Sequence, residues 1–529
     1  MIRKLAWLLI ALSVVAIVAE LFALQLPTLR WPFNVSREIP ALGWQGEKFI
    51  PVFGYLFWLV GILAGAGLLF KFKPGYKLTP ITERRLKRFK ENRRGYVSFL
   101  ILIVMMVIAA LDHVIVGNEA LAVKYNGKWQ FPAFVLEQPM GKDFGLEGDA
   151  ALTKPNYRKL KLAFEDADEG NVVIMPLVPY APTGDTQSTQ TSPLEKREDG
   201  KIYLPGKDEV FSGIAIRLYD PRNPDRMHTR MQIRDGLLDK ETNGWSATGE
   251  RVLSVSYSAG EMVEDTLHWT GEGSVDEFLT AGDALPIRQA FANPAPPLPE
   301  NGHLLGTTSQ GYDVLAYLYG GLQVNFKAAL VYIPLIYTIG ITVGLLMGFF
   351  GGTFDLIVQR LIEIFSNIPF LFVIVIVSGS VPDQWKGLAP VLGILVVFGW
   401  MGMTYLMRTA ALKEKQRDYV AAARVIGCST PTIIFRHILP NAVAILVTLV
   451  PFSISGLIMA LTSLDYLGYG LPESYATWGR LLKDGLDNLS ASWLATSAFL
   501  ALVATLILVT FVGEAVRDAF DPKKFTTYR

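Results

Sequence analysis

The side chains that most often carry catalysis or bind metals are few in this chain. Its five histidines are scattered without the spacing of metal ligands, and its one cysteine, Cys428, forms neither a disulfide framework nor a paired-thiol metal site. Gly-Lys occurs as GKW, GKD and GKI, never within G-x-x-x-x-G-K-[ST], the loop that cradles nucleotide phosphates. The sequence therefore predicts no metal, thiol or nucleotide chemistry in this chain, and no cofactor of its own.

A different kind of function is indicated by one polar stretch, residues 417–443, that separates two apolar stretches. Residues 413–426 favour a helix in which small apolar side chains recur at i, i+3, i+4 and i+7. These side chains are Tyr419, Ala422, Ala423 and Ile426. Gly427 is expected to end the helix, because glycine adopts the left-handed conformation that other residues resist.

A second helix is expected directly after the glycine. The hydroxyl of Thr430 suits its cap, and Pro431 suits its first helical position. Its apolar residues Ile434 and Ile438 lie four positions apart. A helix, glycine, helix unit of this size cannot build a core of its own, so we expect it to dock on a partner protein. The alternative is a solvated connecting loop without a partner.

The long apolar runs of the chain predict a membrane protein. The 529 residues are 51% hydrophobic and 18% charged, and a transmembrane helix needs about 20 apolar residues. The runs that satisfy this requirement are 5–24, 49–70, 96–116, 328–350, 354–378, 388–407, 442–464 and 493–512. The first is long and lacks the small-residue cleavage site of a signal peptide, so we expect it to be retained. The predicted fold class is an all-α polytopic membrane protein with about eight transmembrane helices.

Basic residues predict which ends of these spans face the cytoplasm. Residues 71–95 carry about ten Lys and Arg against two Glu, whereas residues 25–48 carry about three. The former loop is therefore expected in the cytoplasm, together with both termini. Counting the spans forward places residues 417–443 and the basic C-terminal tail, residues 517–529, on the same side.

A soluble insert lies between the third and fourth spans. It holds 29 acidic and 19 basic residues, so it is acidic, and the topology places it in the periplasm. Short β-prone runs, such as VVIMPLVPY, KIYLPG, GIAIRLYD and RVLSVSYSAG, predict a β-rich fold. The expected regions are 1–116 with three spans, 117–305 as the insert, and 306–529 with five spans. Residues 293–302 are expected to form a stiff proline-rich linker back to the membrane.

The stretch YVAAARVIGCSTPTIIFRHILPN, residues 419–441, resembles the coupling motif of binding-protein-dependent ABC import permeases. In that family the pattern Glu-Ala-Ala, Gly and Ile-x-Leu-Pro seats in a groove of the ATPase. The matching positions here are Ala421, Ala422 and Ala423, then Gly427, then Leu439 and Pro440. The sequence departs from the motif at Ala421, which replaces its glutamate, and at His437, which replaces its isoleucine.

Other stretches resemble the peptide-type members of this family. Similar segments are HLLGTTSQGYDVLAYLYGG, GFFGGTFDLIVQRLIEIFSNIPF, LTSLDYLGYGLPESYATWGRLLKDGLDNL and VGEAVRDAFDPKK. RRLKRFKENRRGYVSF and LAVKYNGKWQFPAF resemble the start of the Yej-type permease for oligopeptides and microcin C. The resemblance covers residues 84–144 and 303–524, but not the first two spans or much of the insert.

The resemblance implies a type I ABC importer fold and a permease subunit for peptides, not an enzyme. It implies an ATPase in a separate chain that binds ATP and Mg, either two ATP-binding subunits or a fused ATPase. The other implied partners are a second permease subunit, a periplasmic substrate-binding protein and the lipid of the bacterial inner membrane, with no nucleic acid. The implied ATPase-coupling residues are Tyr419, Ala421, Ala422, Ala423, Arg424, Gly427, Arg436, Ile438, Leu439 and Pro440.

Two other classes of function stay open at this point. In a membrane-anchored periplasmic receptor or assembly factor, the insert would be the active part and the spans only an anchor. An ion-driven transporter is disfavoured, because the spans contain few carboxylates. Asp465, which precedes the two glycines of LDYLGYGLP, is a candidate to line the outer mouth of a transport path.

Overall fold

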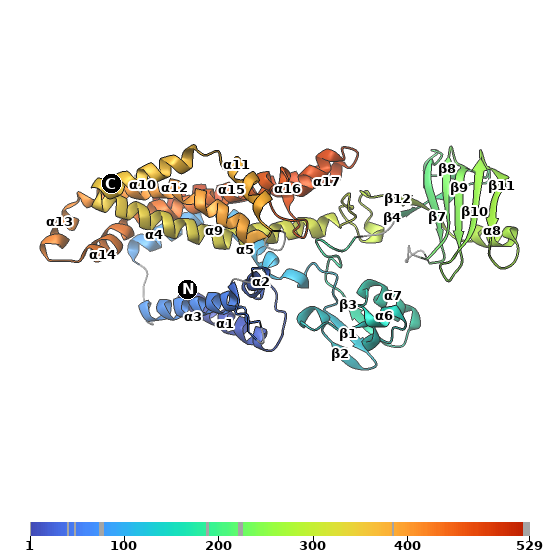
Figure 1. The fold of residues 1–529 in the computed structure, drawn as a ribbon, viewed down its shortest axis with the longest axis horizontal. Helices are drawn as coiled ribbons and strands as arrows, with labels where there is room; N and C mark the ends of the chain where they lie inside the picture. Colours follow the sequence, from blue (N-terminus) through green and yellow to red (C-terminus); the bar gives the residue numbers. More distant parts are fainter. Residues whose placement is uncertain are drawn as a thin grey trace.

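The chain is elongated in the computed structural model, which describes residues 2–39, 42–46, 49–72, 79–186, 190–220, 226–382 and 386–521. A helical bundle occupies one half of the molecule, and two smaller lobes with β-sheets extend from one end of it (Figure 1). The end of the basic tail, residues 522–529, and part of the basic loop, residues 73–78, lie outside the described residues.

Seven helices in the described part of the chain are long and apolar enough to cross a membrane. They are α1 (Ile2–Leu21), α3 (Val52–Lys71), α5 (Arg93–Ala110), α9 (Val314–Phe350), α12 (Leu388–Lys415), α15 (Leu439–Tyr466) and α17 (Ser492–Phe520). Helices suit this environment because they pair every interior backbone group within the same segment. With one broken span, the number becomes eight, and the predicted all-α polytopic fold class is confirmed.

The fifth predicted span, residues 354–378, is not one straight helix. It consists of α10 (Gly352–Asn367) and α11 (Phe370–Ser380), which are bent by 74° at the break between them. Ile368 has an extended backbone, with φ −81° and ψ 119°. The following Pro369 explains this, since proline disfavours the helical conformation in the residue before it. Hydrophobicity alone predicted one span where proline makes two segments.

Small residues bring α9 and α12 close together. Gly340, Gly344 and Gly348 recur every four residues on α9, and a Cβ at each would clash with atoms of α12. At Gly344 the nearest atom is the backbone oxygen of Thr404, which cannot move aside. Such small-xxx-small patterns let helix backbones approach closely within a membrane.

The first two spans pack on each other through Gly61 and Gly65 of α3, which lie against α1. The short helix α2 (Trp31–Glu38) follows α1, and Arg37 donates a hydrogen bond of 2.5 Å to Glu20 of α1. The hydroxyl of Thr28 donates to the backbone oxygen of Ala110 at 2.7 Å. This bond connects the N-terminal unit to the end of α5.

The first lobe of the insert has a small antiparallel sheet of order β2-β1-β3. Its elements are β1 (Ala122–Tyr125), β2 (Lys128–Gln130), α6 (Asp149–Leu152), α7 (Tyr157–Ala167) and β3 (Val172–Ile174), with 3₁₀ turns at Asp112–Val114, Pro132–Phe134 and Gly141–Phe144. Leu160 and Phe164, one turn apart on α7, pack on Val123 and Val173 of the sheet. The helix α7 was not predicted.

The second lobe has a seven-stranded antiparallel sheet of order β11-β10-β9-β8-β7-β12-β4. Its elements are β4 (Gln190–Pro193), β5 (Glu195–Lys196), β6 (Ile202–Tyr203), β7 (Gly213–Leu218), β8 (Met227–Arg234), β9 (Leu237–Trp245), β10 (Arg251–Ser258), β11 (Glu261–Trp269), α8 (Val275–Asp283) and β12 (Ile287–Phe291). Phe278 and Leu279 of α8 cover Leu253 and Val255 on one face of the sheet. The predicted β-prone runs correspond to β3, β6, β7 and β10, so the β-rich insert is confirmed.

The expected proline-rich linker, residues 293–302, is packed rather than extended. It includes a 3₁₀ turn, Pro299–Asn301, and leads to the fully buried His303. His303 Nδ1 lies 2.7 Å from the carboxylate of Asp313, whose other oxygen accepts the N–H of Ala316 and caps α9. The joint between the insert and α9 is therefore held by buried polar contacts.

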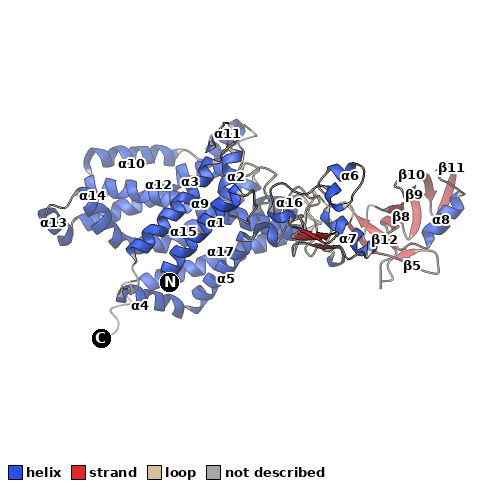
Figure 2. Cartoon of the chain, turned by 90° about the horizontal axis from the view of Figure 1, so that it is seen from below, coloured by secondary structure: helices blue, strands red, loops and turns tan. Residues whose placement is uncertain are grey.

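The remaining helices lie at the two ends of the bundle. They are α4 (Pro80–Glu91), α13 (Asp418–Val425), α14 (Thr430–Thr432), a π-helical turn (Ile433–Ile438) and α16 (Trp478–Asp487). The figures place α13 and α14 at the end far from the β-lobes, and α16 at the end next to them (Figures 1 and 2).

Candidate functional site

The polar stretch between α12 and α15 forms a structured projection, which we call the elbow (residues 417–441). It lies at the end of the bundle furthest from the seven-stranded sheet (Figure 1). Its first arm is α13. Its second arm begins with α14, continues through the π-helical turn and runs directly into α15. The elbow is therefore continuous with a membrane span.

The first arm begins later than the sequence pattern predicted. The helix expected over residues 413–426 is interrupted, because α12 ends at Lys415 and Arg417 has an extended backbone (φ −79°, ψ 146°). α13 starts again at Asp418, whose carboxylate suits the positive end of a helix. This restart decides which side chains of α13 face the bundle.

The predicted apolar stripe is split between two surfaces. Ala423 is 6% exposed and faces the bundle together with Val420, which is fully buried, while Tyr419 is half-buried. Ala422 is exposed, and Ile426 is 80% exposed. The prediction of one continuous stripe is therefore wrong, because it assumed an unbroken helix from residue 413.

The buried side chains of both arms share one apolar core with the ends of α9 and α12. The members of this core are Val420, Ala423, Ile433, Ile434 and Ile438 of the elbow and Leu345, Phe349 and Ala411 of the bundle. None of them is more than 7% exposed. Close-packed interiors have low compressibility, so this core fixes the elbow rigidly to the bundle.

Gly427 sets the angle between the two arms. Its φ of 82° lies in the left-handed region, and a Cβ there would meet open space, so the predicted helix end is confirmed. The cap of the second arm lies one residue earlier than predicted, because Ser429 occupies the N-cap position. Ser429 Oγ lies 2.8 Å from Thr432 Oγ1, while Thr430 is already helical.

The outer side of the elbow is an exposed apolar tip, formed by Ala421, Ala422, Val425, Ile426 and Gly427. Val425 and Ile426 are 89% and 80% exposed. Burying such side chains is favourable by roughly 25 cal/mol per Å² of apolar surface. Adjacent exposed aliphatic side chains are typical of surfaces that bind another protein. The tip therefore suits an apolar groove on a partner.

Polar contacts hold the base of the elbow. The guanidinium of Arg424 lies over the ring of Phe349, 5.2 Å from its centroid. The hydroxyl of Tyr419 donates to Glu414 at 2.8 Å. Burial raises the pKa of Tyr419, and the hydrogen bond to this carboxylate raises it further. These contacts join the first arm to the ends of α9 and α12.

The ten predicted coupling residues all lie on the elbow but on different sides of it. Those that are exposed are Ala421, Ala422, Arg424, Gly427, Arg436 and Pro440; those that are buried or half-buried are Tyr419, Ala423, Ile438 and Leu439. The sequence pattern missed Val425, although it directly precedes Ile426. It also missed the glycines of α9, which the repeat Gly-x-x-x-Gly-x-x-x-Gly over residues 340–348 would have revealed.

A partly buried ion pair close to the elbow was also missed. Arg408 of α12 donates from Nε and Nη2 to the two carboxylate oxygens of Asp355 in α10, each at 2.6 Å. This two-pronged geometry is the strongest form of a carboxylate contact in proteins. It fixes the start of the bent pair of helices to α12, one turn from the elbow's core.

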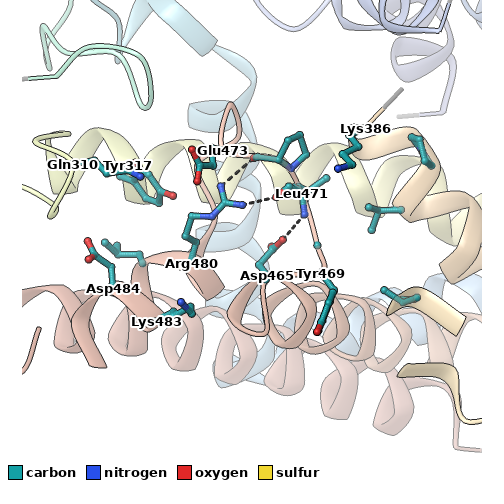
Figure 3. Close-up of a pocket in the computed structure, with 18 of the residues that line it drawn as sticks. Gln310, Tyr317, Lys386, Asp465, Tyr469, Leu471, Glu473, Arg480, Lys483 and Asp484 are labelled. Atoms are coloured by element: carbon teal, nitrogen blue, oxygen red, sulfur yellow. Dashed lines mark hydrogen bonds between the residues drawn. The ribbon is translucent and has the colours of Figure 1, made fainter. Parts of the chain in front are cut away.

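At the opposite end of the bundle, a cavity of about 710 Å³ opens beside the loop that follows α15 (Figure 3). Asp465, 3% exposed, lies in the last turn of α15 and accepts the N–H of Leu471 at 2.8 Å. Arg480 of α16 donates to the backbone oxygens of Leu471 and, at 3.0 Å, of Pro472. The loop after Asp465 thus lines the cavity, and its shape is fixed by the buried side chain of Asp465 and the partly buried side chain of Arg480.

Charged side chains of both signs line this cavity. Lys386 and Lys483 are basic, whereas Glu473, Asp484 and Asp487 are acidic. Asp484 accepts the backbone N–H of Ser309 at 3.0 Å. In the described part of the chain, no three His, Cys, Asp or Glu side chains are grouped as metal ligands. Lys483 and Asp487 form an ion pair at 3.2 Å, so the lining of the cavity is polar and carries both kinds of charge.

Comparison with known proteins gives matches over the same region and beyond it. The family described as "Binding-protein-dependent transport system inner membrane component" matches residues 340–526, which include the elbow. The inner membrane ABC transporter permease protein YejE of Escherichia coli is 31% identical over 449 residues, covering 85% of this chain and 99% of that protein. The 449 aligned residues are more than residues 1–144 and 303–524 contain together. The similarity therefore also includes part of the insert.

Two further relatives agree with this assignment. The peptidoglycan transport system permease protein YejE of Agrobacterium fabrum is 29% identical, covering 84% of this chain and 94% of that protein. The oligopeptide transport system permease protein OppC of Haemophilus influenzae is 30% identical, covering 43% of this chain and 73% of that protein. The chain therefore belongs to the family of binding-protein-dependent ABC transporter permeases, and within it to the YejE group, as an inner-membrane transport subunit rather than an enzyme.

Proposed function

We propose that this chain is the permease subunit of an ATP-driven peptide importer, and that the elbow couples a separate ATPase to alternating access. The observation that carries the proposal is the division of the elbow into an exposed apolar tip and a fully buried base. The exposed tip offers a binding surface. The close-packed base keeps the elbow fixed to the bundle when a partner applies force to the tip.

The second arm provides a route for the force. It continues as helix into α15, whose 28 residues rise about 1.5 Å each and so extend about 42 Å. The last turn of α15 contains Asp465, which holds the loop at the cavity by accepting a hydrogen bond from the N–H of Leu471. A displacement of the tip would therefore reach the cavity along one continuous helix, while α12 carries it through the first arm.

The proposed substrate class is peptides, including oligopeptides. The names of two relatives refer to oligopeptide and peptidoglycan transport, and both kinds of molecule contain peptide bonds. A peptide needs a polar path, because unsatisfied peptide groups cost several kcal/mol each in lipid. The mixed charges of the cavity complement a substrate with an ammonium group at one end and a carboxylate at the other.

The proposed assembly contains a second permease subunit, two ATP-binding subunits or a fused ATPase, and a periplasmic substrate-binding protein. Both termini and the elbow would face the cytoplasm, with ATP and Mg bound by the ATPase. Residues 1–116, 117–305 and 306–529 would be the N-terminal spans, the periplasmic insert and the permease core. The ten coupling residues would contact the ATPase directly from the tip or support the tip from the base.

Replacement of Gly427 by valine tests this proposal. A β-branched residue at φ 82° is strained by roughly 1–2 kcal/mol, so the angle between the arms should change. We expect G427V to assemble with the ATPase, measured by copurification, and to lose at least about tenfold of ATP-dependent peptide uptake in proteoliposomes.

The control is Gly249→Val, in the turn between β9 and β10. Gly249 has a similar φ of 91° and open space around a Cβ, so this variant carries equal strain far from the elbow and should keep its uptake. Full uptake by G427V would contradict the proposal. A membrane-anchored receptor would keep its activity even after deletion of residues 413–441.

A further inference from the structure

The helix α4 has no part in the proposed coupling, yet it is held in a defined position. Its N-cap is Thr79, whose hydroxyl accepts the N–H of Thr82, and Pro80 occupies its first turn. Asn92 alone separates α4 from α5, and its side chain accepts the N–H of Gly95 at 3.2 Å. The two helices are therefore arms of one fixed bend at the start of a membrane span.

Aromatic contacts fold α4 back onto the bundle. The ring of Phe89 meets the ring of Phe99 edge-on, with centroids 5.5 Å apart, and that of Tyr96 at 6.2 Å. The guanidinium of Arg85 lies 4.6 Å from the ring centroid of Phe520, at the end of α17. Because Phe89 reaches a residue within α5, α4 lies across the ends of α5 and α17 instead of extending away from them (Figure 2).

The opposite side of α4 and the first turn of α5 form an exposed basic surface. Its members are Arg84, Lys87, Lys90, Arg93 and Arg94. None of these five forms an ion pair with any residue that the structure describes. Glu83 and Glu91 are exposed beside them and leave the surface with a net positive charge.

This basic surface lies at the edge of the lipid-facing part of α5. Val97, Ile101 and Val104 recur along one side of α5 and are 52%, 42% and 56% exposed, as expected for side chains that contact lipid. Val97 is three residues beyond Arg94, which corresponds to about 5 Å along the helix. The basic groups are therefore level with the phosphates of a bilayer whose hydrocarbon begins at Val97.

We propose that the basic surface of α4 binds the phosphate groups of acidic phospholipids and so fixes the end of α5 and α17 to one face of the membrane. Charge selects the ligand, because five exposed cations attract a lipid with net negative charge and gain little from a zwitterionic one. The position of α4 favours the bilayer over a protein partner, because α4 lies beside the lipid-facing surface of α5. The tip of the elbow, by contrast, projects beyond the end of the bundle, where a protein partner can reach it (Figure 1). The proposal does not depend on the coupling role of the elbow.

The test uses the full chain purified in an uncharged detergent and titrated with phosphatidylglycerol or phosphatidylcholine. The measurement is the midpoint of thermal unfolding, followed by tryptophan fluorescence, against lipid concentration. We expect phosphatidylglycerol to raise the midpoint. In the variant R84Q/K87Q/K90Q, the lipid concentration for half of that shift should increase by about tenfold or more, since each basic group near an acidic surface contributes measurably.

Two matched variants separate charge from structure. K207Q/R230Q/K240Q removes three exposed basic groups of the second lobe and should respond like the unmodified chain. R84K/K87R/K90R keeps the charge on α4 and should respond likewise, even if R84Q/K87Q/K90Q proves less stable without lipid. Salt at about 1 M should reduce the phosphatidylglycerol shift, because the screening length falls to about 3 Å.

Three results would overturn the proposal. The first is an equal shift with phosphatidylcholine, which would mean general solvation by lipid. The second is an equal shift with soluble glycerol phosphate, which would mean a site for small anions. The third is an unchanged response of R84Q/K87Q/K90Q, which would place the lipid elsewhere or leave the basic surface to a protein partner.

Discussion

At the scale of single residues, the glycines of α9 decide how closely two central helices pack. A side chain at Gly344 would meet the backbone of Thr404 and Arg408, which cannot move without shifting α12. We expect Gly344→Val to destabilise the chain by roughly 1–3 kcal/mol, the usual cost of overpacking. The midpoint of thermal unfolding in detergent measures this loss. Gly402→Val on α12, where a Cβ meets open space, should leave the midpoint unchanged, and an equal loss in both variants would contradict the argument.

Two valines of the same arm should respond differently to the same substitution. Val425 is 89% exposed on the tip, whereas Val420 is fully buried at the base. We expect Val425→Ser to keep its thermal stability and to bind the ATPase more weakly in a titration of the purified subunits. Val420→Ser should lose roughly 1–3 kcal/mol of stability, because a buried apolar group is replaced by a hydroxyl. Unchanged ATPase binding by Val425→Ser would show that the tip is not the binding surface.

The exposed side chains of the elbow could be predicted only in part. The pattern around Gly427 predicted ten coupling positions, all of which lie on the elbow, and the conformation of this glycine followed from its type alone. The exposed side of α13 did not follow, because periodicity cannot show that the helix stops at Lys415 and restarts at Asp418. Because of that break, Val420 lies on the buried face of α13, where the pattern had placed Ile426.

At the scale of elements, the contact of α8 with the seven-stranded sheet should depend on pH. His228 of β8 stacks on Phe278 of α8, with ring centroids 4.2 Å apart. Burial, together with the smaller effect of the nearby charge of Arg217, lowers the pKa of His228 from its ordinary value of 6.5 to about 4. The folded lobe therefore resists taking up a proton that the unfolded chain accepts readily.

The sign of the effect follows from these two pKa values. Above pH 6.5 the histidine is neutral in both states, and its full contribution is present. Between pH 6.5 and 4 only the unfolded chain binds the proton, so stability falls as the pH falls, by at most roughly 3 kcal/mol. Calorimetry at pH 7.5 and 4.5 measures the loss, which His228→Phe should reduce. The same pH dependence in both chains would contradict this.

Elements were predicted best where one physical signal dominates. Long apolar runs identified the spans, and alternating β-prone runs identified four strands of the insert. The bend of 74° between α10 and α11 was not predicted. A count of apolar residues does not register the backbone conformation that Pro369 imposes on Ile368, so the apolar run predicted one straight span. The helix α7 was missed for a similar reason, since it lies among residues rich in turn formers.

At the scale of the whole molecule, the elbow and the β-lobes occupy opposite ends (Figure 1). If the bundle crosses the membrane, these ends face different compartments. We expect a cysteine at Ser258, which is exposed at the end of β10, to react with an impermeant maleimide on intact spheroplasts. A cysteine at Ile426 should react only after the membrane is permeabilised. Labelling of both positions in intact spheroplasts would contradict the proposed topology.

Crosslinking from the tip tests directly whether the elbow contacts the ATPase. Cys428 is the single cysteine, so Cys428→Ser gives a background in which Ile426→Cys carries a unique photoreactive group, with Val420→Cys as the buried control. During ATP-dependent peptide uptake, we expect position 426 to crosslink to a nucleotide-hydrolysing protein and position 420 not to do so. If uptake continues while position 426 crosslinks to no nucleotide-hydrolysing protein, the elbow does not couple an ATPase to transport.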